Sequence, residues 1–119
     1  MIRGLDHVQV AAPAGCEAEA RRFYGVLLGL PELEKPEPLR SRGGVWFRCG
    51  EQQLHVGVDE RFAPARKAHP ALAVTGYDEL RTRLHDAGVA AEDDDSIEGL
   101  RRSYVRDAWG NRIELVEVP

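Results

Sequence analysis

Hydrophobic and polar residues alternate with a period of two in several short stretches of the chain, which is the pattern of half-buried β-strands. Two longer stretches instead repeat their hydrophobic residues at helical spacing. In the first of these, Ala20, Phe23, Tyr24 and Leu27 follow the spacing i, i+3, i+4, i+7, and Gly29 ends the pattern. The predicted strands are 5–11, 30–34, 45–49, 53–58, 69–74, 89–92, 100–106 and 111–118, and the predicted helices are 16–28 and 77–87.

Polar segments rich in proline, glycine or charge connect these elements. Residues 35–44 contain Pro36, Pro38 and two adjacent glycines, so they predict a mobile loop. Residues 93–99 predict a second polar loop, and residues 59–68 predict a connector with room for one helical turn. We expect the two loops to shape the mouth of a binding pocket, because loops of this kind set specificity.

The same order of elements, one strand, a helix and three further strands, occurs twice, at about 1–58 and 67–119. An internal repeat of this kind indicates two copies of one structural unit. We therefore predict an α+β fold built from two βαβββ modules, whose curved mixed sheets form an open barrel around one pocket. A chain of 119 residues is long enough for one such domain.

Composition narrows the choice of partners and compartment. The net charge is -4 and the lysines and arginines are scattered, which argues against nucleic acid as a partner. No hydrophobic stretch approaches the length of a membrane span, and the first strand begins without a signal peptide before it. The two cysteines, Cys16 and Cys49, match no metal-binding or redox spacing. These features predict a cytoplasmic protein with reduced thiols and no membrane partner.

Overlaying the two repeats aligns four side chains that can bind a metal. His7 falls on His69, and His55 falls on Glu114. Strand parity turns all four away from their hydrophobic neighbours and onto the concave face of the sheets. Three imidazoles and one carboxylate suit Zn²⁺, Ni²⁺, Fe²⁺, Co²⁺ or Mn²⁺. Spacing alone leaves alternatives open, because strand histidines also pack or hydrogen-bond without a metal, and Glu114 can pair with an arginine.

Three motifs resemble those of the vicinal oxygen chelate superfamily: L-D-H-V-Q-V, K-A-H-P-A-L-A-V and V-R-D-A-W-G-N-R-I-E-L-V-E. This superfamily contains glyoxalase I, extradiol dioxygenases, methylmalonyl-CoA epimerase, fosfomycin resistance enzymes and bleomycin-binding proteins. The resemblance covers nearly the whole chain. Its most specific part is similar to the pattern D-P-x-G-N-x-I-E-L, although Ala108 replaces the proline. The resemblance implies the paired βαβββ fold and, commonly, a homodimer.

In metal-dependent members of this superfamily, the ligands come from the first and last strands of each module. The resemblance therefore implies that His7, His55, His69 and Glu114 bind a divalent transition metal and that Glu114 can also transfer a proton. His55 departs from the pattern, since glyoxalase I usually has a carboxylate there and the epimerase has a glutamine. It is a candidate for a fourth ligand, a general acid or base, or a hydrogen-bond donor to the substrate.

Other residues of the same face are candidates for binding a small-molecule substrate. Parity adds Gln9, Gln53, Trp46 and Arg48 from the first module and Arg102, Tyr104 and Arg106 from the second. Aromatic and arginine side chains together suit a small anionic ligand. The alternatives are that Arg102 and Arg106 pair with nearby acids and that Trp46 serves packing.

The resemblance implies, first, a metal-dependent glyoxalase-like lyase or isomerase whose substrate chelates the metal through adjacent oxygens. The second alternative is ring-cleaving oxygenation of a catechol on Fe²⁺ held by His7, His69 and Glu114. The third is a non-catalytic protein that binds a drug or metabolite in an aromatic pocket. Metal analysis separates the third from the other two, and oxygen uptake separates the second from the first.

Overall fold

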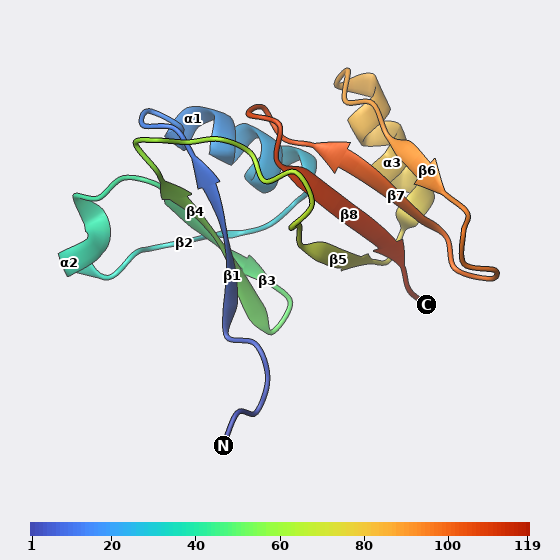
Figure 1. Cartoon of the computed structure of the whole chain (residues 1–119), viewed down its shortest axis with the longest axis horizontal. Helices are drawn as coiled ribbons and strands as arrows, with labels where there is room; N and C mark the ends of the chain where they lie inside the picture. Colours follow the sequence, from blue (N-terminus) through green and yellow to red (C-terminus); the bar gives the residue numbers. More distant parts are fainter. The chain divides into compact units, whose positions relative to one another are not determined.

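Two four-stranded mixed sheets, one in each half of the chain, are the framework of the structure (Figure 1). The computed structural model describes residues 1–119, which divide into two units, Met1–Ala63 and Pro64–Pro119. Each unit has the element order of a βαβββ module, and the first contains one additional short helix. The predicted α+β class and the predicted duplication are therefore confirmed.

The first unit contains β1 (His7–Ala12), β2 (Glu32–Leu33), β3 (Val45–Cys49) and β4 (Gln52–Val58). The strand order is β1-β4-β3-β2, in which β1 runs parallel to β4 and the other pairs are antiparallel. One face of the sheet buries the hydrophobic side chains of Val10, Phe47, Leu54 and Val56. The helix packs on this face, where the rings of Tyr24 and Phe47 lie 6.0 Å apart.

The helix of the first unit begins as an α-helix, α1 (Glu17–Ala20), and continues as a π-helix, η1 (Arg21–Leu27). The sequence pattern predicts one regular α-helix over 16–28, so the wider second part is a correction. A bond from the N–H of Leu28 to the C=O of Phe23, five residues back, measures 2.9 Å. The whole predicted hydrophobic stripe is nevertheless buried: Ala20, Phe23, Tyr24 and Leu27. Packing against the sheet therefore decides how this segment winds, more than its local spacing does.

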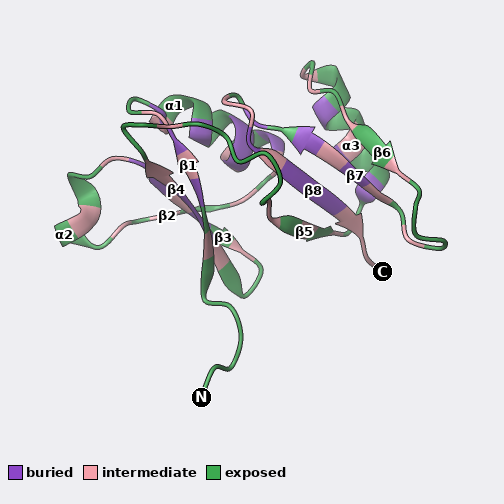
Figure 2. Ribbon diagram, in the orientation of Figure 1, coloured by how far each residue is buried: buried purple, intermediate pink, exposed green.

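The second unit contains β5 (Ala71–Val74), α3 (Tyr77–Asp86), β6 (Glu92–Asp94), β7 (Arg102–Arg106) and β8 (Arg112–Glu117). The strand order is β5-β8-β7-β6, with β5 parallel to β8. Leu84 of α3 is fully buried, as are Ile113 and Leu115 of β8, the strand that Figure 2 colours largely as buried. The hydroxyl of Tyr77 donates to Ser103 Oγ at 2.7 Å, which satisfies two polar groups inside this core.

Three segments differ most from the sequence prediction. Residues 35–44 contain a short helix, α2 (Glu37–Arg40), with a proline in its first turn. Proline is tolerated there because the N–H groups of the first turn have no partner within the helix. The strand predicted at 89–92 lies at β6 instead, because backbone pairing with β7 runs from Glu92 to Asp94. The connector 59–68 is closed by a turn between Asp59 and Phe62 and holds no helix.

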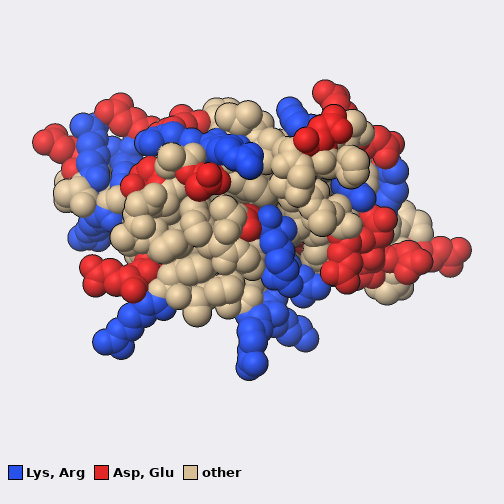
Figure 3. Space-filling model, turned by 90° about the horizontal axis from the view of Figure 1, so that it is seen from above, with Lys and Arg blue, Asp and Glu red and all other residues tan.

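The surface is charged and mixed in sign. Figure 3 shows acidic side chains gathered over β6 and the loop after it, where three consecutive aspartates occur, Asp93–Asp95. None of the helices has both the length and the hydrophobicity needed to span a membrane.

Candidate functional site

The polar face of the first sheet holds the residues that strand parity predicts. Cross-strand register places Gln9 opposite His55, His55 opposite Trp46, and Trp46 opposite Leu33. His7 lies two residues before Gln9 on β1 and therefore shares its face. Residues opposite one another in neighbouring strands have their side chains in contact range, so the row forms one continuous polar and aromatic surface.

The imidazole of His55 lies between two other rings. The His7 ring is stacked on it with centroids 4.2 Å apart, and the Trp46 indole is stacked with centroids 3.8 Å apart and planes 5° apart. Only 4% of His55 is exposed. Burial, followed by the nearby His7, lowers the pKa of His55, so the ring is held neutral.

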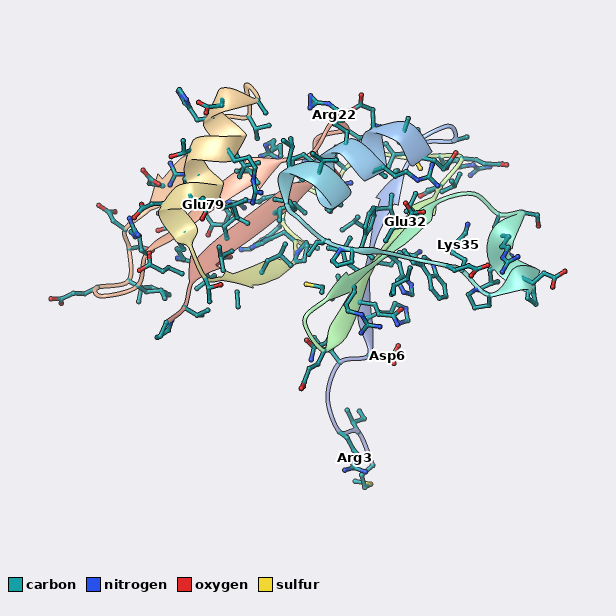
Figure 4. The ribbon with its side chains drawn as sticks, turned by 180° about the vertical axis from the view of Figure 1, so that it is seen from behind. Arg3, Asp6, Arg22, Glu32, Lys35 and Glu79 are labelled. Carbon is teal, nitrogen blue, oxygen red and sulfur yellow. The ribbon has the colours of Figure 1, made fainter.

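Hydrogen bonds fix the tautomers of both histidines. His7 Nδ1 lies 2.9 Å from Oδ1 of Asp6, which stands just before β1 (Figure 4), and a carboxylate there can only accept the proton. His55 Nε2 lies 2.8 Å from Gln53 Oε1, to which it donates. These bonds leave a lone pair on His7 Nε2 and on His55 Nδ1, the two nitrogens that can bind an electrophile or accept a proton.

The second unit brings His69 and Glu114 together. His69 Nε2 lies 2.9 Å from Glu114 Oε1, and His69 Nδ1 lies 2.6 Å from the backbone oxygen of Lys67. Both residues are mostly buried, with side-chain exposures of 22% for His69 and 11% for Glu114. The edge of the Tyr104 ring meets His69 with centroids 5.6 Å apart.

Arg102 holds the other oxygen of Glu114. Its Nη1 donates to Glu114 Oε2 at 3.2 Å, and its Nη2 lies 2.9 Å from Asp94 Oδ2. Burial would raise the pKa of Glu114, but its contacts with His69 and Arg102 outweigh it and keep the pKa below its usual range. Glu114 is therefore an ionised carboxylate near neutral pH, with one oxygen fixed by an arginine and one facing an imidazole.

Asp94 completes this network from β6. Its Oδ1 accepts both the N–H of Ser96 at 3.0 Å and the hydroxyl of Ser96. Its Oδ2 accepts the Tyr104 hydroxyl at 3.1 Å. The Ser96 bonds, more than its other contacts, lower the pKa of Asp94 to about 2. The Arg102 guanidinium therefore faces two ionised carboxylates.

A separate cavity of about 300 Å³ lies beside the aromatic end of the first sheet. Its lining comes from β2, β3 and the segment around α2: Arg21, Glu32, Leu33, Glu34, Lys35, Arg40, Gly44, Val45 and Trp46. Figure 4 labels Glu32 and Lys35 on two of these segments. The charges of the wall are largely satisfied, since Arg21 pairs with Glu32 and Lys35 Nζ donates to the Gly43 carbonyl at 2.6 Å. Residues of the predicted loop 35–44 therefore line this cavity.

The four predicted ligands form two pairs, His7 with His55 in the first unit and His69 with Glu114 in the second. No three His, Cys, Asp or Glu side chains form a metal-binding group in the structure. Among the predicted substrate-binding residues, Trp46 stacks on His55 and Tyr104 contacts His69, while Arg48 is exposed. Arg102 follows the alternative considered for it, because it pairs with acids.

Two supporting residues, Asp6 and Asp94, have no role in the sequence analysis, which places Gln53 only on the face of His55. Asp6 and Gln53 orient the two histidines of the first unit, and their signal was present, since Asp6 precedes His7 and Gln53 shares the face of His55. Asp94 gave no such signal, because its contact with Arg102 depends on where β6 begins.

A protein assigned to the glyoxalase family from Bacillus anthracis matches the chain along its whole length. The two sequences are 50% identical, the TM-score is 0.96, and the match covers 100% of this chain and 98% of that chain. The chain belongs to the glyoxalase family. The wider group is the vicinal oxygen chelate superfamily, so the resemblance read from the three motifs is confirmed.

More distant structures share the glyoxalase fold. A lactoylglutathione lyase from Agrobacterium tumefaciens is 24% identical with a TM-score of 0.73, covering 96% of this chain and 92% of that one. A fosfomycin resistance protein from Listeria monocytogenes is 18% identical with a TM-score of 0.77, covering 100% of this chain and 96% of that one. No protein-family model matches the sequence, and no curated protein does.

Proposed function

We propose that this glyoxalase family member is a metal-dependent lyase or isomerase whose small substrate binds the metal through two adjacent oxygens. The proposed ligands are His7, His55, His69 and Glu114. The metal would be a divalent transition ion, Zn²⁺, Ni²⁺, Fe²⁺, Co²⁺ or Mn²⁺, since all of these accept imidazole nitrogen and carboxylate oxygen. Neither pair of side chains is a complete ligand set, so the proposal requires both pairs on one ion.

The His69–Glu114 pair is the observation that carries the proposal. Because Nδ1–H of His69 is given to the Lys67 carbonyl, a neutral ring turns the lone pair of Nε2 toward the carboxylate. Two acceptors 2.9 Å apart repel each other unless a proton or a metal cation lies between them. A histidine whose other nitrogen donates to a backbone carbonyl is also the usual arrangement in metal sites.

The first unit fits the same chemistry. Asp6 and Gln53 occupy one nitrogen of each imidazole and leave His7 Nε2 and His55 Nδ1 as donors. A carboxylate behind a ligating histidine raises the basicity of the ring, as in the second shell of many metal sites. The donor set is therefore three imidazole nitrogens and one carboxylate oxygen.

When bound, the ion would supply a Lewis acid that polarises the two substrate oxygens. The chain's own groups would position and move the proton. Arg102 holds the Glu114 carboxylate in place, and this carboxylate would accept a proton from the substrate carbon beside those oxygens. Trp46 covers one face of His55 and limits the access of water to this ring.

Metal analysis of protein loaded with each ion in turn tests the proposal. We expect about one equivalent per chain in the wild type and a clear loss in His7→Ala and Glu114→Gln. His85→Ala, which removes an exposed imidazole on α3, is the matched control and should keep its metal. Full metal content in Glu114→Gln would show that the ligand assignment is wrong. A wild type that takes up no ion would favour the non-catalytic binding protein.

One observation favours a second reaction. The His55 ring stacks between His7 and Trp46 and its Nε2 donates to Gln53, so packing and hydrogen bonding account for this strand histidine without a metal. His7, His69 and Glu114 would then be the two-histidine, one-carboxylate set of ring-cleaving dioxygenases. Oxygen uptake by the Fe²⁺-loaded protein with a catechol supports this reaction. Metal content that survives in His55→Ala would agree with it.

A further inference from the structure

Three arginines lie on the polar face of the second sheet, and only one of them has its charge balanced. Arg102 forms two ion pairs with carboxylates of that face. Arg106 donates to the backbone oxygen of Gly110 at 3.0 Å, and the Cζ of Arg112 lies 3.9 Å from the centroid of the Tyr104 ring. Neither of these two guanidiniums has a carboxylate partner.

Arg106 and Arg112 stand directly opposite each other across the β7–β8 hairpin. Side chains in such positions have Cβ atoms about 5 Å apart, and like charges there repel. Asp107, which follows Arg106 in the turn of the hairpin, is buried and accepts hydrogen bonds from the backbone N–H groups of Trp109 and Asn111. An anion bound between the two guanidiniums would turn this repulsion into attraction.

Arg112 is prepared to bind such an anion. The Tyr104 ring attracts a cation by its face and accepts no conventional hydrogen bond, so the N–H donors of Arg112 stay available. The ring also restricts the guanidinium to one place, which reduces the entropy lost on binding. Tyr104 also contacts His69, so the aromatic ring connects this cationic end of the sheet to the His69–Glu114 pair.

We propose that Arg112 and Arg106, beside Tyr104, form a subsite for a carboxylate or phosphoryl group. A planar guanidinium matches the paired oxygens of both anions. Arg112 precedes Glu114 by two residues on β8, a distance of about 7 Å along the strand. The inference deepens the proposed function and rests on it in one respect: the substrate would bear its anion a few atoms from its metal-binding oxygens.

Nitrogen–proton spectra of the arginine Nε–Hε groups, recorded on the metal-free full chain, test the subsite. Inorganic phosphate is one probe and succinate is the other, so the two arms distinguish phosphoryl from carboxylate binding. We expect saturable shifts of the Arg112 and Arg106 signals with at least one probe. Arg112→Gln and Arg106→Gln should each lower the affinity for that probe roughly tenfold, because each removes one charge-assisted contact.

Arg83→Gln is the matched control, because it removes one exposed arginine of the same unit that makes no ion pair. It should change the affinity less than about twofold. Arg112→Lys keeps the charge and loses the planar fork, so partial retention of binding is expected. An equal loss of affinity in Arg83→Gln would assign the effect to diffuse charge and overturn the subsite. Shifts that do not saturate in the wild type would also overturn it.

The outcome is separable from that of the proposed function. Arg112→Gln should still take up metal, and Glu114→Gln should still bind the probe. Probe binding without any metal uptake would sink the metal proposal and keep the subsite. Metal uptake with no probe binding would refute the subsite and support the metal proposal.

Discussion

The carboxylate of Glu114 lies 2.9 Å from the imidazole of His69, although 45 positions of the chain separate them. The backbone brings them together, since β5 runs parallel to β8 and the N–H of Glu114 donates to the C=O of Pro70 at 3.0 Å. Two side chains held by neighbouring main chains need little rearrangement to share a proton or a cation.

Arg102→Gln should weaken metal binding about 10- to 100-fold, the range found when a residue behind a ligand is removed. The reason is that Glu114 Oε2 loses its only arginine and the carboxylate becomes free to turn. Competition with a chelator measures the affinity. Arg102→Lys should recover part of it, and Arg83→Gln should leave it unchanged. An unaltered affinity in Arg102→Gln would mean that Arg102 does not position Glu114.

Asp94→Asn should change the pH dependence of folding. The pKa of Asp94 is lowered from 3.8 to about 2, so its carboxylate stabilises the folded state above pH 3.8, and this contribution is lost as the pH falls toward 2. The free energy of unfolding in urea should therefore differ between variant and wild type near neutral pH, and the difference should shrink near pH 2. Asp95→Asn is the control. A difference that stays constant over this range would contradict the pKa.

Gly44→Ala should destabilise the first unit by at least about 3 kcal/mol. The φ angle of Gly44 is +84°, and a Cβ there would lie 2.2 Å from the backbone oxygen of Val56, which cannot move without disturbing β4. Gly50→Ala is the control, since its φ is +62° but nothing lies within 4 Å, so strain alone should cost about 1 kcal/mol. Urea unfolding of both variants checks the difference, and equal costs would refute the clash.

Cys16 should resist alkylation in the folded protein. Burial, then a hydrogen bond with Glu17, raises the pKa of the thiol from 9.0 to about 11, which lowers the thiolate fraction near pH 8 about a hundredfold. Mass spectrometry after iodoacetamide treatment, with and without urea, measures the protection. The same shift means that Cys16 favours folding below pH 9 and loses this effect as the pH rises toward 11. Rapid labelling of Cys16 without urea would contradict both statements.

Strand parity was sufficient to predict the face on which the candidate residues lie. A side chain's face depends only on its position along a strand, so His55 and Glu114 could be placed once their strands were recognised. The repeat added the matching of first and last strands between modules. Both signals are local or periodic, and one sequence contains them.

The sequence did not predict which side chains contact one another across neighbouring strands. The stack of Trp46 on His55 follows from the β3–β4 register, and the contact of Arg102 with Asp94 follows from β6 beginning three residues later than its pattern suggests. Registers are decided by the packing of the whole sheet, which no local pattern encodes. The π-helical winding of 21–27 was missed for a similar reason, because its residues follow the sheet beneath them.

The stack of Trp46 on His55 also gives the protein an optical signal. An excited indole in contact with an imidazole loses emission when the imidazole becomes positively charged, because the cation accepts an electron from it. Trp109, the other tryptophan of the chain, lies in the β7–β8 turn and can be replaced by phenylalanine. Fluorescence of that variant would then follow the charge on His55 directly, without an added dye.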